Sequence, residues 1–165
     1  MLTKILVALD NSDMSQDVFD EAVYLAKTTG ASLMLLHVLS NFDEPSLEGF
    51  FIETNIYDAQ LLTETHQKNL RDWEQIKQNR KNWLRSKCHL GISLGIKTEF
   101  TLNTGNPSKI ICNIARSWDA DIIVIGRRSS RRALSELFLG SVSSYVVHYA
   151  PCSVLTVQKH LQIKR

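Results

Sequence analysis

Short aliphatic runs alternate with longer amphipathic segments along this chain, and that alternation restricts the fold more than any other feature. The runs cover residues 4–9, 32–38 and 121–125 and consist mainly of Ile, Leu, Val, Met and Ala. Continuous apolar runs of this length are typical of strands that helices cover on both faces. Strands that alternate with helices build a parallel sheet between two helical layers. The sequence therefore predicts an α/β fold.

The first forty residues predict a strand, a helix and a second strand. The first run ends in the turn-forming cluster 10–13, and apolar residues then recur at helical spacing from Val18 to Ala26. Gly30 follows where a left-handed residue commonly ends a helix. The run 32–38 returns as a buried strand. This order predicts a right-handed crossover between two parallel strands.

The middle of the chain is less regular. Residues 39–57 mix Pro, Gly and Phe, which predicts a long loop. Part of this loop is expected to pack against the protein or to form a lid. Helix formers dominate from about 58 to 90, and Gly91 and Gly95 are predicted to bracket the connection after that helix. Residues 97–102 alternate polar and apolar side chains, which is typical of a strand near the edge of a sheet.

The last third predicts the remaining elements. Asn106 is a good N-cap, and Pro107 suits the first helical position. The run 121–125 predicts a central strand, and residues 153–157 predict the last strand. The pattern predicts one open, parallel, five-stranded, Rossmann-like domain over residues 1–158, with helices on both faces and a short basic tail over 159–165.

Composition and charge exclude several classes of protein. The 165 residues are 44% hydrophobic, which is too apolar for a disordered chain. No apolar run approaches the ~20 residues that span a bilayer. The first apolar stretch is too short for a secretory signal, so we expect a cytoplasmic protein without membrane contact. A formal net charge of +2 gives no electrostatic argument for a nucleic-acid partner.

The residues that usually carry catalysis or bind metals do not form a recognisable set. The five histidines show no metal-ligand spacing with one another or with a cysteine. Three cysteines far apart in sequence predict free thiols rather than a disulfide framework. No nucleophile-elbow, metalloprotease or Walker motif occurs. The sequence therefore predicts neither catalytic residues nor a metal site.

One segment, residues 125–143, has the properties of an anion site. A strand ends at Gly126, a loop with four arginines follows, and Gly140 and Ser141 open the next helix. Glycine lets a ligand approach the backbone closely. The start of a helix presents N–H groups without partners and the positive end of its dipole. A solvated basic loop would have the same composition.

The chain resembles the universal stress protein family. ATP-binding members carry a glycine, two residues, a glycine, nine residues and a glycine followed by serine or threonine, between the fourth strand and the last helix. Four further segments look like the family: 5–12, 105–107, 120–126 and 150–155. The resemblance covers nearly the whole chain except the stretch between about 40 and 95.

This sequence departs from the family pattern in its glycine spacing. Gly126 and Gly140 are 14 positions apart, one more than in the pattern, and the middle glycine is replaced by Ser129 or Ser130. A serine held at positive φ would be strained by about 1 kcal/mol or more. Arg127 and its neighbouring arginines are able to pair with phosphates through charge-assisted hydrogen bonds.

The resemblance implies that the protein binds ATP, or ADP or AMP, with or without Mg²⁺. Asp10 would lie near the ribose or adenine and Val38 against adenine, although an N-cap or Asx-turn explains Asp10 equally well. The implied nucleotide-binding residues are Ala8, Leu9, Asp10, Val38, Ile125, Gly126, Arg127, Ser130, Gly140, Ser141, Val142 and Ser143.

Three functions fit these observations. The first, which the resemblance implies, is a stress-response regulator that binds an adenine nucleotide and forms a homodimer through its last strand, Val154 to Val157. The second is a nucleotide-free adaptor whose basic loop contacts an acidic partner. The third is a slow ATPase, because positioning and electrostatics can suffice for phosphoryl transfer.

Overall fold

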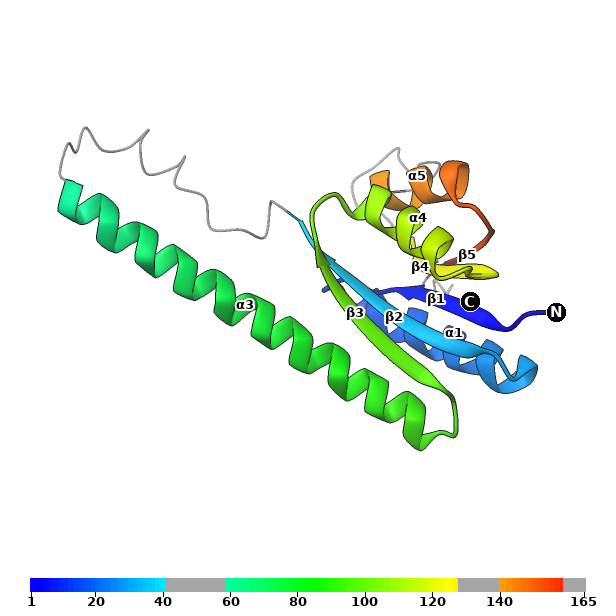
Figure 1. The fold of residues 1–165 in the computed structure, drawn as a ribbon. Helices are drawn as coiled ribbons and strands as arrows, with labels where there is room; N and C mark the ends of the chain where they lie inside the picture. The colour runs from blue at the N-terminus through cyan, green and yellow to red at the C-terminus, as the bar shows by residue number, and fades with distance from the viewer. Residues whose placement is uncertain (41–58, 128–139, 159–165) are drawn as a thin grey trace, which may run out of the picture.

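The computed structural model describes residues 1–40, 59–127 and 140–158 and shows an α/β domain with a sheet of five strands (Figure 1). The strands are β1 (Lys4–Ala8), β2 (Ser32–Leu39), β3 (Thr98–Thr104), β4 (Ile122–Gly126) and β5 (Ser153–Val157). The helices are α1 (Met14–Thr29), α3 (Ala59–Ser93), α4 (Pro107–Ser117) and α5 (Ser141–Tyr149). The predicted loop 39–57 lies outside the described residues except for Leu39, which ends β2, and Ser40, and so does the tail 159–165.

All strand pairs are parallel, in the order β3-β2-β1-β4-β5. This arrangement confirms the predicted sheet, and it confirms an edge position for the strand over 97–102. The run 121–125 is interior but not central, because β4 lies between β1 and β5. β1 takes the central place, and Ile5, Leu6 and Val7 are completely buried. The order of strands reverses between β1 and β4, where ligands bind in open α/β sheets.

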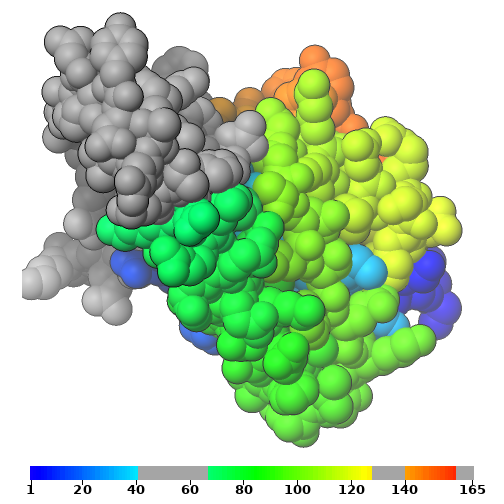
Figure 2. All heavy atoms as spheres, turned by 60° about the vertical axis from the view of Figure 1, so that its left-hand side comes forward, coloured from blue at the N-terminus to red at the C-terminus, as the bar shows by residue number. Residues whose placement is uncertain are grey.

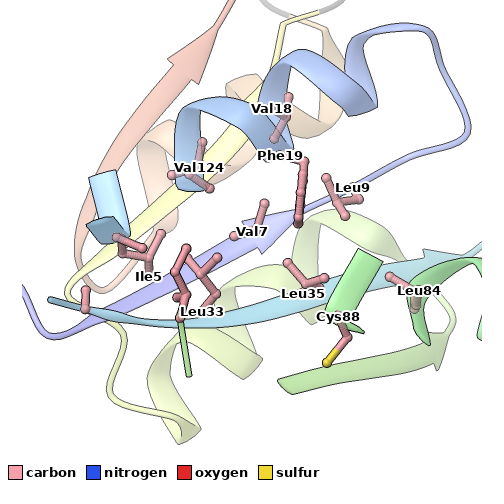
Figure 3. Packing of buried hydrophobic residues seen from close by; sticks show 14 residues of the cluster. Ile5, Val7, Leu9, Val18, Phe19, Leu33, Leu35, Leu84, Cys88 and Val124 are labelled. Carbon is pink, nitrogen blue, oxygen red and sulfur yellow. The ribbon is translucent and has the colours of Figure 1, made fainter. Parts of the chain in front are cut away.

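The helices form two layers, one on each face of the sheet (Figure 1). Successive side chains of β1 alternate between the faces, so Ile5 and Val7 join a core with α1 and α3. Figure 3 shows this core, in which Phe19 of α1 and Leu84 of α3 lie over the sheet. Leu6 and Ala8 instead contact the residues of α4 and α5. The two cores hold the strand ends at fixed positions.

Helix α3 is the longest element, with 35 residues. It runs beside β3 and continues past the end of the sheet (Figure 1). In the space-filling view it forms the teal-to-green band down the front of the molecule (Figure 2). Its C-terminal half packs on the sheet through Leu84 and Cys88, which are buried.

Two glycines at the end of α3 have different roles, and the predicted connection between them is wrong in part. Gly91 lies inside the helix, where a Cβ atom would come within 2.5 Å of Thr98 Oγ1 on β3. It therefore allows α3 and β3 to approach closely. Gly95 has φ of 80° and makes the turn into β3.

The predicted helix boundaries are confirmed where their caps are described. Gly30 ends α1 with φ of 76°, and its N–H donates to the carbonyl of Ala26. The Asn106 side chain accepts a hydrogen bond of 3.2 Å from the N–H of Lys109 and begins α4. Within the described part of the chain, no helix is both long enough and apolar enough to cross a membrane.

Candidate functional site

A pocket of about 730 Å³ opens at the carboxyl ends of the strands. Its walls come from the β1–α1 turn, the end of β2, the β3–α4 turn, the end of β4 and the start of α5. A parallel sheet whose strands lead into helices brings several helix N-termini to one edge. Here α1, α4 and α5 all begin at the pocket wall. Helix starts favour negative charge, so this pocket favours an anionic ligand.

The pocket brings together ten of the twelve residues that the sequence singled out. They are Ala8, Leu9, Asp10, Val38, Ile125, Gly126, Gly140, Ser141, Val142 and Ser143. Arg127 follows β4 but does not line the pocket. Its N–H donates to the carbonyl of Val157 at 2.8 Å, and its Nη1 donates to Gln158 Oε1 at 3.2 Å. Ser130 lies outside the described residues.

The start of α5 presents its backbone to the pocket. Gly140 is the N-cap, and the first intrahelical bond runs from the N–H of Ser144 to the carbonyl of Gly140 at 2.8 Å. The N–H groups of the first turn have no acceptor within the helix. The Ser143 hydroxyl donates to the carbonyl of Gly140 at 3.0 Å. The Ser143 hydroxyl is therefore already used within the turn, and the backbone N–H groups are donors that the turn can offer to a ligand.

The β1–α1 turn forms a second wall, which Asp10 organises. One oxygen of its carboxylate, Oδ1, accepts hydrogen bonds from the Ser12 N–H, at 3.0 Å, and from the Ser12 hydroxyl. This geometry is the Asx-turn that residue type alone allows. The carboxylate is half-buried and lines the pocket, so the turn fixes an acceptor there.

The need for a glycine at position 126 is explained by packing against α1 as well as by the approach of a ligand. A Cβ atom at this position would lie 3.2 Å from Val18 Cγ2 and 3.6 Å from Met14 Cβ. The glycine therefore lets the first turns of α1 approach the end of β4. The same closeness places α1 against the pocket.

The sequence reasoning missed several polar residues of the pocket, and three of them bear most directly on a ligand. Ser15 on α1 is buried, and its hydroxyl has no hydrogen-bond partner among the described residues. His37 on β2 is 5% exposed, with Nδ1 2.8 Å from the carbonyl oxygen of Leu9. Arg80 on α3 donates from Nη1 to Asn11 Oδ1 at 2.6 Å. His37 had a weak signal, a polar residue inside an apolar run, whereas Arg80 had none without the packing of α3.

The described residues form no group of three or more His, Cys, Asp or Glu side chains able to hold a metal ion. All three cysteines are free thiols. Burial raises the pKa of Cys88, Cys112 and Cys152 above the ordinary value, so each remains a protonated thiol at neutral pH. None of the three lines the pocket.

The chain matches known proteins along nearly its whole length. Residues 1–158 match the model of the universal stress protein family. Universal stress protein Sll1388 of Synechocystis is 35% identical over 94% of this chain and 97% of its own length. Universal stress protein YxiE of Bacillus subtilis is 33% identical over 96% of this chain and 100% of its own.

Solved structures share the fold. Universal stress protein UspA from Lactobacillus plantarum superposes with a TM-score of 0.67 at 27% identity, over 94% of this chain and 97% of its own. The Archaeoglobus fulgidus protein, solved in complex with dAMP, has a TM-score of 0.57 at 22% identity, over 93% and 96%. An Arabidopsis thaliana protein with AMP bound has a TM-score of 0.56 at 19% identity, over 99% and 95%. The family match and the curated relatives together show that this chain belongs to the universal stress protein family.

Proposed function

We propose that this protein binds an adenine nucleotide (ATP, ADP or AMP) in the pocket at the carboxyl ends of the strands. One observation carries the proposal. The same pocket has an apolar wall and, at the start of α5, backbone N–H groups that have no acceptor within the helix. Structural relatives that carry dAMP and AMP support the same ligand class. The pocket volume lies in the range of small-molecule sites.

The pocket offers groups that suit both the base and the phosphates of a nucleotide. The walls formed by Val38, Ile111 and Ile125 are apolar and would cover the base. The first turn of α5 would hold phosphates through its backbone N–H groups. Asp10, fixed by its Asx-turn, also lines the pocket and would accept a hydrogen bond from the ribose or base.

The biological role that we propose is regulation in the stress response, with the nucleotide changing the protein's affinity for partners. We favour binding over catalysis, because the hydroxyl–carboxylate pair described in the pocket, Ser12 and Asp10, is the Asx-turn that shapes the β1–α1 turn. Slow hydrolysis of ATP would require phosphate release above background. A nucleotide-free adaptor would require that the pocket takes up no nucleotide.

The first test is mass spectrometry of nucleotide released from the purified protein, followed by calorimetric titration with ATP in the presence and absence of Mg²⁺. We expect released ATP, ADP or AMP and a measurable heat of binding. No released nucleotide and no heat up to about millimolar ATP would contradict the proposal, since a Kd of 1 mM is only ~4 kcal/mol of binding. The adaptor function would then be the better account.

A matched pair of variants tests the role of the pocket. Asp10→Asn removes the charge from an acceptor that lines the pocket, and we expect the ATP affinity to fall about tenfold, as for the loss of one charge-assisted hydrogen bond. Asp13→Asn, three positions further on, changes an exposed residue that makes no side-chain cap bond and does not line the pocket. Equal effects of the two substitutions would show that the nucleotide binds elsewhere.

A further inference from the structure

Arg80 supplies the only Lys or Arg side chain among the described residues that line the pocket. It comes from α3 and not from the segments that carry the glycine motif. We propose that the Arg80 guanidinium binds a phosphate group of the nucleotide and makes the pocket prefer nucleotides to nucleosides. This inference rests on the proposed function and adds a residue that determines specificity.

The spacing of residues along α3 places Arg80 on the helix face that packs against the sheet. Arg80, Trp83, Leu84, Lys87 and Cys88 recur at intervals of three and four residues, so they share one face of the helix. Leu84 and Cys88 are buried on the sheet. Arg80 therefore extends the buried face one turn further, to the level where the strands end.

Two contacts fix the position of Arg80 at the pocket. Nη1 donates to Asn11 Oδ1 of the β1–α1 turn at 2.6 Å. One turn away, the Trp83 ring meets the buried His37 ring edge-on, with centroids 5.7 Å apart and an interplanar angle of 77°. His37 itself lines the pocket. The helix is thus attached to the pocket wall by both a hydrogen bond and a ring contact.

The charge of Arg80 has no neutralising partner in the described structure. The single ion pair found among the described residues joins Lys77 to Glu74, so no described carboxylate lies within 4.0 Å of the guanidinium. The residue is half-buried, and Asn11 takes up one of the five N–H donors of the guanidinium. A half-buried cation is costly without an anion, and an arginine fork matches the geometry of a phosphate.

Other residues of the pocket also favour an anion near the β1–α1 turn. The start of α1 lies beside Asn11, and the buried Ser15 hydroxyl on that first turn has no hydrogen-bond partner among the described residues. An anion held by Arg80 would therefore meet the positive end of a helix dipole. Asp10 is the acidic residue in this wall, and its Oδ1 is already bonded to Ser12.

The test measures ATP and adenosine affinity by calorimetry for the full chain and three variants. Arg80→Gln should weaken ATP binding about tenfold and change adenosine binding less than about twofold, since one charge-assisted interaction is lost. Arg80→Lys keeps the charge without the fork and should lie between the wild type and Arg80→Gln. Arg85→Gln is the matched control, because exposed Arg85 also bonds an asparagine, Asn82, and does not line the pocket.

A purely structural role for Arg80 would give a different result. If Arg80 only attaches α3 to the β1–α1 turn, Arg80→Gln would weaken ATP and adenosine equally or leave both unchanged, and the inference would be overturned. If the wild type binds neither compound, the proposed function fails as well. If the wild type binds both and Arg80→Gln leaves their affinity ratio intact, only the role of Arg80 is refuted.

Discussion

Asp121 joins the first residues of the chain to the start of β4. Its Oδ2 accepts hydrogen bonds from the Thr3 N–H at 2.7 Å, the Thr3 hydroxyl at 2.8 Å and the Lys4 N–H at 2.9 Å. The N–H of Asp121 donates in return to the carbonyl of Lys4 at 3.0 Å. These bonds, the one from the Thr3 N–H first, lower the pKa of Asp121 below its ordinary value.

A lowered pKa in the folded protein makes this contribution depend on pH. The stabilisation is fully present above the unfolded pKa of about 3.9 and is lost as the pH falls through the lower, folded pKa. Asp121→Asn should therefore lower the midpoint of urea unfolding at about pH 7, and the difference from wild type should shrink as the pH falls from about 4 through the folded pKa. Asp72→Asn on the exposed side of α3 serves as the control. A difference that is constant across this range would show that charge is not the cause.

At the scale of single elements, the junction of α3 and β3 depends on Gly91. A Cβ atom there would lie 2.5 Å from Thr98 Oγ1 and 3.1 Å from both Thr98 Cβ and Cγ2. Thr98 is buried, and its hydroxyl donates to the Ile96 carbonyl at 3.0 Å. Gly91→Ala should therefore destabilise the protein by about 1–3 kcal/mol, despite the better helix propensity of alanine.

The cause of that loss can be isolated with a double-mutant cycle in urea. Thr98→Ala removes the hydroxyl and methyl groups that meet the new Cβ, so Gly91→Ala should cost clearly less in that background. A cost that is the same in both backgrounds would mean that the contacts with the Thr98 hydroxyl and methyl groups are not responsible. The effect of Thr98→Ala alone on the unfolding free energy is subtracted in the cycle. The lost Thr98 hydrogen bond therefore does not enter the result.

The sequence predicted elements where one local signal was enough. The aliphatic runs marked the interior strands, and Gly30 and Asn106 marked helix ends through their own backbone or side-chain chemistry. Gly91 was misread, because glycine at a turn and glycine at a close helix–strand contact look alike in sequence. Arg80 was missed for a similar reason. Its place at the pocket depends on which face of a 35-residue helix meets the sheet, and that is a tertiary property.

At the scale of the whole molecule, β5 is an edge strand of the sheet. The carbonyl of Val157 accepts from the Arg127 N–H at 2.8 Å, so the backbone groups of Val157 point toward β4. Backbone groups alternate in direction along a strand, and those of Val154 and Thr156 therefore point away from β4. Edge groups of this kind form a template for pairing with a second chain. We propose that two copies pair through β5 in antiparallel orientation.

This proposal predicts the effect of one proline. Thr156→Pro removes an N–H that points away from β4 and leaves the β4–β5 hydrogen bonds intact, because edge strands tolerate proline at such positions. Light scattering after gel filtration should give twice 18.8 kDa for the wild type and 18.8 kDa for the variant. Thr156→Val, which keeps the N–H, should remain dimeric, and circular dichroism should show that all three proteins are folded. A wild-type monomer, or a folded Thr156→Pro dimer, would exclude pairing through this edge, since neither is compatible with a backbone ladder that needs the Thr156 N–H.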